Sequence, residues 1–272
     1  MIFLTKENYY NKESNIEYCS CSQIKDFIAC ERCAYLKLLG QYEEEESEAL
    51  AISSLIDAVL SNEEAEFLDN NKDNPFIFLK SGKLSAKAQA AYEVIQQAEN
   101  DQKFIKYLNG EHQVIMTGII ADVPIKIKMD SYFKDKVIVD LKCMKNFDLL
   151  WNDELRIKQN FIDYYDYVMQ GAIYQEIVYQ NTGKRLPFII AAMTKEKYSE
   201  RALLNIPQEE MDEKLEQVKE ILPRIQAIKR SEEAIGLRAC GKCNYCKSVA
   251  KVTNIYNYKD YFNKRGGLIW YF

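Results

Sequence analysis

The sequence predicts an α/β fold in which a central mixed sheet is flanked by helices. Helical patterns dominate residues 1–110, and three strand patterns follow one another between residues 112 and 144. A helical pattern at 165–179 then precedes a short apolar strand at 186–194. The order strand, strand, strand, helix and strand, with helices before and after it, is typical of a mixed sheet covered by helices.

The flanking helices follow from local spacing of apolar residues. In the N-terminal part, helical spacing covers residues 35–40 and 85–99, around a loop expected at 70–76. A long amphipathic helix is predicted at 209–231. Because proline lacks a backbone N–H, we expect Pro223 to interrupt and kink this helix.

The composition is that of one globular domain. The chain has 272 residues, 47% hydrophobic and 28% charged, so it can bury a sizeable core. We expect a single domain with a helix-rich part at 1–110, a core at 111–205 and a C-terminal helix with a cysteine-rich segment at 206–272. No apolar run is long enough to cross a membrane, and the N-terminus lacks a signal-peptide pattern. A cytoplasmic protein with no membrane partner is therefore expected.

A predicted β-hairpin at residues 125–142 carries the most informative pattern. In its first strand apolar and polar residues alternate up to Asp130, and in its second strand a β-branched run leads into Asp140. A polar turn at 134–136 joins the two strands. Because strand side chains alternate between faces, Asp140 and Lys142 point to one side, and the residue between them points to the opposite layer.

Two carboxylates and a lysine on neighbouring strands indicate metal-assisted chemistry on a phosphate ester. A hard cation such as Mg²⁺ or Mn²⁺ prefers oxygen ligands, which Asp130, Asp140 and the backbone carbonyl of Leu141 can supply. Lys142 can orient or deprotonate an attacking water, or neutralise charge on the phosphate. The same residues also fit an exposed, charged strand edge without function, so the pattern needs its context.

The context is the helix at 165–179, which places Gln170 and Tyr174 one turn apart on the same face. Packing in the core is the alternative role for these residues. With the two aspartates and the lysine of the hairpin followed by this Gln-x-x-x-Tyr helix, the chain resembles the PD-(D/E)xK nuclease superfamily and, within it, the RecB-like group. The resemblance implies a restriction-endonuclease-like core, with the glutamine and tyrosine close to the catalytic site and the DNA backbone.

Over about residues 20–255, the chain resembles more closely the phage and prophage RecE-type exonucleases, described as exodeoxyribonuclease VIII, PDDEXK-like. The further features that carry this likeness are residues 22–25 followed by Cys30 and Cys33, the helix with Asp57, and a terminal Cys-x-x-Cys-x-x-Cys segment. The resemblance implies a Mg²⁺-dependent exonuclease that resects double-stranded DNA ends. Its single-stranded product would serve a recombinase that anneals strands, and relatives form ring-shaped homo-oligomers around DNA.

The resemblance also implies a third metal ligand. In relatives an acidic or histidine residue on an early helix joins the metal site, and Asp57 stands at the matching position. Many relatives have histidine there and glycine four residues earlier, where this chain has Asp57 and Ser53. Aspartate suits a hard cation. An exposed position on an amphipathic helix is the alternative for Asp57.

Eight cysteines in a protein expected in the cytoplasm indicate thiols or metal ligands rather than disulfides. Cys240, Cys243 and Cys246 offer three thiolates, and Cys30 or Cys33 can supply a fourth for a tetrahedral site. In RecB-like nucleases such as AddB, one cysteine before the core and three after it hold an iron-sulfur cluster, so the resemblance implies a cluster here. The last cysteine gap is shorter than in those relatives, which leaves zinc and free thiols open.

The net charge of −5 does not by itself indicate a nucleic-acid partner. Much of the acid lies in runs at 41–50, 61–70 and 207–220, which are typical of solvated faces. A nuclease needs only a local basic channel. The candidates for phosphate contacts are Lys126, Lys128, Lys145, Arg156 and Lys158.

Two other functions fit the sequence. One is a RecB-like nuclease that acts on single-stranded DNA or cuts endonucleolytically. The other is a noncatalytic module that binds DNA ends on a decayed nuclease fold. Decayed members lose a metal carboxylate or the lysine, whereas all three residues stand here, which favours activity. The single histidine, His112, lies beside no nucleophile motif and is expected to be structural.

Overall fold

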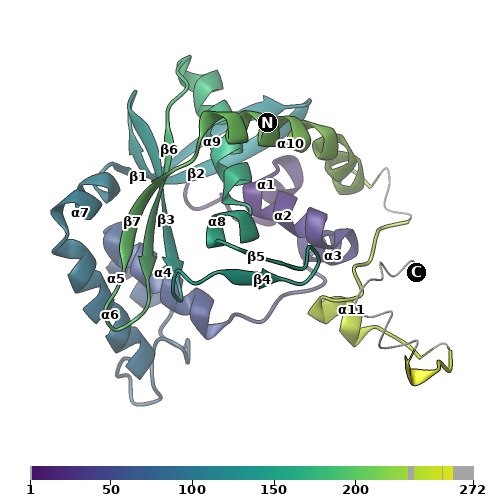
Figure 1. The fold of residues 1–272 in the computed structure, drawn as a ribbon, viewed down its shortest axis with the longest axis horizontal. Coiled ribbons are helices and arrows are strands. Elements are labelled where there is room, and N and C mark those ends of the chain that lie inside the picture. The colour runs from purple at the N-terminus through teal and green to yellow at the C-terminus, as the bar shows by residue number, and fades with distance from the viewer. Residues whose placement is uncertain (1, 232–235, 253, 260–272) are drawn as a thin grey trace.

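A computed structural model describes residues 2–231, 236–252 and 254–259 and shows a five-stranded sheet with helices on both faces (Figure 1). The strand order is β1-β2-β3-β6-β7, in which β3 and β6 are parallel and the other neighbours antiparallel. The predicted α/β fold with a mixed sheet is thus confirmed. The strands are β1 (Glu111–Ile120), β2 (Val123–Phe133), β3 (Val137–Met144), β6 (Phe188–Thr194) and β7 (Arg201–Asn205), and a separate hairpin is formed by β4 (Leu150–Asn152) and β5 (Ile157–Gln159).

Helices cover both faces of the sheet and bury two apolar cores. Helices α4, α6 and α7 pack on one face, whereas α2, α9 and α10 pack on the other (Figure 1). Within the described part of the chain, no helix is long and apolar enough to cross a membrane. The helices are α1 (Lys12–Glu17), α2 (Cys21–Ala29), α3 (Glu31–Leu39), α4 (Glu48–Leu60), α5 (Glu64–Asn70), α6 (Ala86–Glu99), α7 (Gln102–Leu108), α8 (Phe161–Tyr164), α9 (Tyr167–Thr182), α10 (Gln208–Lys229) and α11 (Asn244–Ser248).

Strand β3 divides its side chains between these two cores. Ile138 packs in the core beneath α9, while Val139 and Leu141 pack in the core beneath α4 and α6. Asp140 and Lys142 therefore project toward α9, as the alternation of strand side chains predicts.

The two strands of the predicted hairpin separate soon after their turn. The turn at 134–136 is present, and β2 and β3 then pair over three residue positions, of which Ser131 opposite Val139 is the last. Asp130 and Asp140 are the next residues on the two strands. The acidic side chains thus lie where the sheet opens and leaves room beside the backbone.

Helix α9 owes its position to its two ends and to one glycine. The Asp166 side chain accepts a hydrogen bond from the Met169 N–H at 3.3 Å and caps the start of the helix, and Gly183 ends it in a left-handed conformation. Gly171 faces the sheet, where a β-carbon would lie 2.9 Å from the ring of Phe188. This close approach holds α9 against β6.

Helix α10 runs through Pro223 as one helix, so the predicted interruption is wrong. A proline inside a helix removes one backbone hydrogen bond and costs about 3 kcal/mol. The apolar face of α10 buries Leu222, Ile225 and Ile228 against the core, and this packing outweighs the local loss.

The N-terminal segment covers β2 where β3 has departed. Cys19 pairs with β2 as a short parallel bridge: its N–H donates to the Pro124 carbonyl at 2.8 Å, and the Lys126 N–H donates to the Cys19 carbonyl at 2.9 Å. The Lys126 side chain is 1% exposed, and its ammonium donates to Asn15 Oδ1 at 2.7 Å. The expectation that Lys126 contacts a DNA phosphate is therefore wrong, because this segment encloses it.

A pH-dependent contribution to stability follows from this buried lysine. Burial lowers the pKa of Lys126 to about 8, with a smaller effect of Lys229 in the same direction and of Cys19 in the other. Above that pH the unfolded chain, with an ordinary lysine pKa near 10.4, binds more protons than the folded one. The penalty for burying the charge is therefore greatest below pH 8 and is relieved as the pH rises.

We expect the unfolding free energy of the wild type, relative to Lys126→Met, to increase by on the order of 1 kcal/mol between about pH 7 and 9.5. Urea denaturation at the two pH values measures this difference. The exposed Lys136 provides a control, since Lys136→Met should show no such pH dependence. A difference that is the same at both pH values for Lys126→Met would contradict the prediction.

Candidate active site

Asp140 forms the centre of a polar cluster at the opening of the sheet. Its side chain is nearly inaccessible, with the residue 2% exposed. The amide of Gln170 on α9 donates to Asp140 Oδ1 at 2.5 Å, and the Lys142 ammonium forms an ion pair with Oδ2. Within the described part of the chain, this ammonium is the partner of Oδ2, and no further donor reaches that oxygen. A buried carboxylate oxygen of this kind is suited to a cation.

Asp130 lies across the opening from Asp140. Its Oδ2 accepts a hydrogen bond from the Leu141 backbone N–H at 2.9 Å. Burial raises the pKa of Asp130 well above its usual value, and the charges of Asp140 and Asp57 raise it further. Since the N–H and C=O of a strand residue point to the same side, the Leu141 carbonyl also faces the opening. The structure thus brings the predicted carbonyl ligand to the two aspartates.

Asp57 reaches the same cluster from α4. It is half-buried rather than exposed, so the solvated-helix alternative does not describe it. Burial raises the pKa of Asp57, and the charge of Asp140 acts in the same direction, while Lys128 and Lys142 oppose it. Asp57 thus lies within electrostatic range of Asp130 and Asp140, and carboxylate oxygens are the ligands that a hard divalent cation prefers.

Lys142 is held between the carboxylates and an aromatic ring. Its ammonium lies 4.8 Å from the centre of the Tyr167 ring, in a cation–π contact. Burial alone would lower the pKa of Lys142, yet the charges of Asp140 and Asp130 raise it above the usual range. With these carboxylates ionised, Lys142 is a cation that can donate hydrogen bonds to a water or a phosphate oxygen.

Gln170 and Tyr174 both reach the site, but in different ways. Gln170 contacts Asp140 directly. Tyr174 donates its hydroxyl hydrogen to the Lys128 carbonyl at 3.0 Å, is almost wholly buried, and packs its ring against Phe188. Tyr174 therefore supports the backbone of β2 two residues before Asp130, so its role combines packing with positioning.

Several residues around the site escaped the sequence analysis. Lys25 on α2 donates to the Tyr165 carbonyl at 2.6 Å and lies 4.8 Å from the Tyr167 ring, which it shares with Lys142. Tyr167 also lies three positions before Gln170 on α9. This spacing on the same helix could have identified Tyr167 from the sequence. No local pattern predicts that Lys25 lies beside Tyr167.

Lys128 lies at the site among tyrosines of the N-terminal segment. Its ammonium is 4.7 Å from the ring centre of Tyr10 and 5.7 Å from that of Tyr9. Burial raises the pKa of Tyr9 far above its ordinary value, and Asp130 is among the charges that act on it. Of the predicted phosphate contacts, Lys128 is thus near the acidic cluster, where its charge lowers the pKa of Asp57.

Comparison with known proteins agrees with this geometry. Residues 20–249 match the family described as a PDDEXK-like domain of unknown function (DUF3799). The chain belongs to this PDDEXK-like family. A crystal structure from Eubacterium rectale, described as a "putative exonuclease", is 37% identical, with a TM-score of 0.88 over 96% of this chain and 98% of that one. The chain is therefore a nuclease-like protein with the restriction-endonuclease-like core that the sequence predicted.

Other comparisons add little. The structure of SSO0001 is 13% identical and has a TM-score of 0.34 over 84% of this chain and 96% of that one, too low to carry an argument. No curated protein matches the chain.

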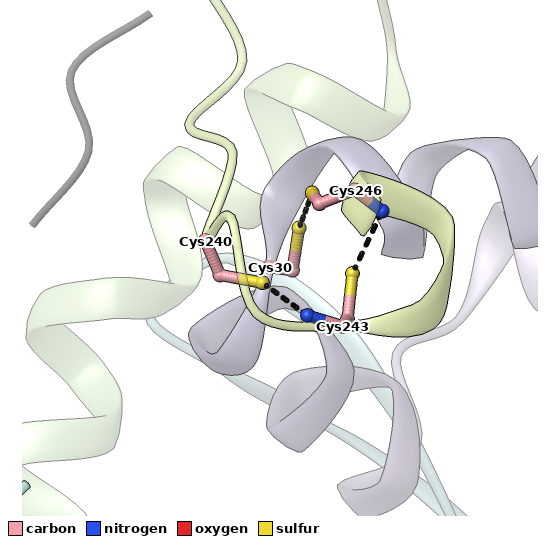
Figure 2. A group of neighbouring side chains, drawn as sticks. All are labelled: Cys30, Cys240, Cys243 and Cys246. Carbon is pink, nitrogen blue, oxygen red and sulfur yellow. Dashed lines mark hydrogen bonds between the residues drawn. The ribbon is translucent and has the colours of Figure 1, made fainter. Parts of the chain in front are cut away.

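A second cluster in this PDDEXK-like protein consists of four cysteines. Cys30 follows α2, and Cys240, Cys243 and Cys246 lie in or beside α11, so the site joins the two ends of the described chain (Figure 2). All four sulfur atoms lie within 4.8 Å of one another, and Cys30 and Cys246 are 3.6 Å apart. The fourth position is thus taken by Cys30, while Cys33 packs beside the group.

The backbone around these cysteines favours a thiolate at Cys240, whereas burial raises the pKa of Cys30 and raises that of Cys246 to about 12. The Cys243 N–H donates to Cys240 Sγ at 3.2 Å, and the Cys246 N–H donates to Cys243 Sγ at 3.4 Å (Figure 2). Burial would raise the pKa of Cys240, but hydrogen bonds from backbone N–H groups lower it to about 7. A thiolate is the form that binds metals.

Repulsion among the carboxylates of the acidic cluster should lower the unfolding free energy of the metal-free protein. In the metal-free protein, Asp130→Asn removes one charge while its side-chain oxygen still accepts from Leu141. A carboxyl whose pKa is raised by folding destabilises the fold as the pH increases, so at pH 7 the substitution should raise the unfolding free energy by on the order of 1 kcal/mol.

The same variant should lose any stabilisation by Mg²⁺ or Mn²⁺. Thermal unfolding in EDTA and in each metal measures both effects. Asp122→Asn, at an exposed residue, serves as the matched control and should behave as the wild type. A variant that is less stable in EDTA and still responds to metal would show that Asp130 is a structural acceptor.

Proposed function

We propose that the protein is a Mg²⁺-dependent DNA exonuclease that resects double-stranded ends. The observation that carries the proposal is the opening between β2 and β3, where Asp130 and Asp140 face each other beside Lys142 and the charge of Asp57 acts on both. The exonuclease description of the Eubacterium rectale protein supports the same activity.

The residues at the opening have distinct roles in this proposal. Asp57, Asp130, Asp140 and the Leu141 carbonyl would hold Mg²⁺ or Mn²⁺, and the buried Asp140 Oδ2 fits such a ligand. The bound cation would polarise the phosphate and lower the pKa of an attacking water. Gln170 fixes the orientation of Asp140 through its hydrogen bond.

Lys142 places a positive charge where negative charge develops on the scissile phosphate. Its ring contact with Tyr167 and its ion pair with Asp140 restrict the ammonium to this position. Lys128 and Lys25 add cations at the same site and can bind flanking phosphates. Tyr174 holds the backbone that carries Lys128 and Asp130.

The biological setting rests on the resemblance to RecE-type exonucleases. In that setting the product is a single-stranded tail for an annealing recombinase, and a homo-oligomer encloses the duplex. A nuclease for single-stranded DNA, an endonuclease and a noncatalytic DNA-end-binding module are the alternatives that the next experiment separates.

We expect the wild type with Mg²⁺ to digest end-labelled linear duplex DNA and to leave a closed circular duplex intact. Asp140→Ala and Lys142→Ala should each reduce the rate by at least about 100-fold, because each removes a group that acts at the reacting phosphate. Gel analysis of either labelled end reports the polarity. Asp122→Asn serves as the active control.

Three outcomes would contradict the proposal in different ways. Cleavage of the circle would indicate an endonuclease, and digestion of single strands alone would indicate the single-strand alternative. Retardation of linear DNA in a gel without any digestion would indicate the binding module.

We propose in addition that Cys30, Cys240, Cys243 and Cys246 bind a metal. Sulfur atoms around one tetrahedral ion, at about 2.3 Å from zinc, lie about 3.8 Å apart. The separations of up to 4.8 Å between these four sulfurs are close to that value, which favours a single ion over an iron-sulfur cluster with one cysteine on each iron. Such an ion would hold the C-terminal segment against Cys30, at the end of the helix α2 that carries Lys25.

We expect the purified protein to contain about one zinc or iron ion per chain, measured by elemental analysis. Cys246→Ser should lose this metal and lower the thermal unfolding temperature, because the tie between the two segments is broken. Cys143→Ser is the matched control, since Cys143 lies outside the four-cysteine group. Several irons with acid-labile sulfide would indicate a cluster, and protein prepared without air yet free of metal would contradict a metal site.

A further inference from the structure

We propose that the β4–β5 hairpin is a binding platform for the end of the DNA duplex, with Trp151 stacking on a terminal base. This inference rests on the proposed nuclease function and adds to it a surface that engages the substrate. The sequence pattern gave Arg156 and Lys158 of this hairpin as candidate phosphate contacts but assigned no role to its apolar side chains. Four observations carry the proposal: its place in the chain, its anchoring, its exposed side chains and its charges.

The hairpin lies between the two elements that supply the catalytic residues. Strand β3 carries Asp140 and Lys142 and leads directly into β4, and β5 leads through α8 into α9 with Gln170. Figure 1 shows the hairpin running from the end of β3 beneath α8 toward α3. The hairpin is thus part of the segment that connects these two elements.

Aromatic rings couple the base of the hairpin to the active site. Phe147, just before β4, stacks on Phe161 of α8 with ring centres 5.4 Å apart. Phe161 in turn lies 6.3 Å from Tyr167, the residue whose ring contacts Lys142. Leu150 also packs on the main core. The base of the hairpin is therefore fixed relative to the catalytic lysine.

Beyond this base the hairpin presents large apolar side chains to solvent. Trp151 is 51% exposed and Leu155, at the tip, is 60% exposed. Leu149 and Ile157 are exposed as well. The register places Ile157 on the opposite face from Trp151, so the hairpin exposes apolar side chains on both faces, which is typical of a segment that binds a partner.

The hairpin holds Trp151 in a defined orientation beside a cation. The indole N–H donates to Asp153 Oδ1 at 2.9 Å, which restricts the ring. In the register of the hairpin Trp151 lies directly opposite Lys158, so both side chains stand on the same face. An aromatic ring with an adjacent lysine is the combination that binds a base and its phosphate.

The face of the hairpin that carries Trp151 also carries Lys158, a cation that suits a phosphate. Asp153 keeps its negative charge while it accepts from the indole, and Glu154 pairs with Lys242 at 3.0 Å. The Lys158 ammonium forms no ion pair with any carboxylate in the described ranges of the chain. The hairpin thus offers a positive charge next to its rings, and exposed apolar residues such as Leu155 can press on the last base pair of a duplex.

The test uses the full chain with a single tryptophan. The other tryptophan, Trp270, lies outside the described residues and is replaced in Trp270→Phe, so that fluorescence reports on Trp151. Ca²⁺ replaces Mg²⁺ to limit digestion during binding. We expect a blunt duplex to quench this fluorescence, and 2-aminopurine at the end of a duplex to lose fluorescence as the indole stacks on it.

Substitutions on the hairpin should weaken these responses. Trp151→Ala should lower the affinity for the duplex end roughly 5-fold to 100-fold, the range for loss of one stacked base, and should abolish the 2-aminopurine signal. Trp151→Phe should restore much of both, which a misfolded variant would not. Lys158→Ala should weaken binding and reduce its dependence on salt. Tyr198→Ala, at a residue 80% exposed between β6 and β7, is the matched control.

The outcomes distinguish failure of the hairpin proposal from failure of the proposed nuclease function. If the wild type digests linear duplex in Mg²⁺ but Trp151→Ala binds and digests equally well, the hairpin proposal fails and the nuclease function stands. If the wild type neither binds nor digests DNA, the proposed function itself fails and the hairpin proposal fails with it. If Trp151→Ala instead dissociates a wild-type oligomer in light scattering, without a change in affinity per subunit, the hairpin is a contact between subunits and the proposal is overturned.

Discussion

The separation of β2 from β3 after three residue pairs is the constraint on which the rest of the site depends. Had the two strands stayed paired, the Leu141 N–H would bond to β2, and no space would remain between Asp130 and Asp140. Because they part, the Leu141 N–H is satisfied by the Asp130 carboxylate at 2.9 Å. The gap in the sheet therefore creates the acidic opening and also supplies the donor that orients one of its ligands.

The opening requires support from outside the sheet. The N-terminal segment pairs with β2 through Cys19 and encloses Lys126, so the exposed edge of β2 is covered by backbone that contributes hydrogen bonds. On the other side, α9 contributes Gln170 to Asp140 and Tyr174 to the backbone of β2. A buried group of like charges destabilises the fold, and these contacts hold it in place.

The two ends of the described chain are fastened together beside this site. Glu31 on α3 forms an ion pair with Arg224 of α10 at 2.6 Å and accepts from the Arg238 N–H at 2.8 Å. The four-cysteine group lies next to this pair and joins the same segments (Figure 2). Because α2 carries Lys25 and precedes Cys30, the fastening also determines where a cation from the N-terminal part meets the catalytic lysine.

The sequence by itself determined the mixed α/β fold, the hairpin with Asp130, Asp140 and Lys142, and the helix with Gln170, because these depend on periodicities within single elements. Only the tertiary structure decided that Lys126 is buried, since the enclosing segment is distant in sequence. For the same reason the periodicities could not place Asp57, which only the resemblance assigned to the site, could not choose between Cys30 and Cys33, and could not bring Lys25 to Tyr167. Alternation and helical spacing report which face a side chain takes, whereas the partner on that face is set by how distant elements pack.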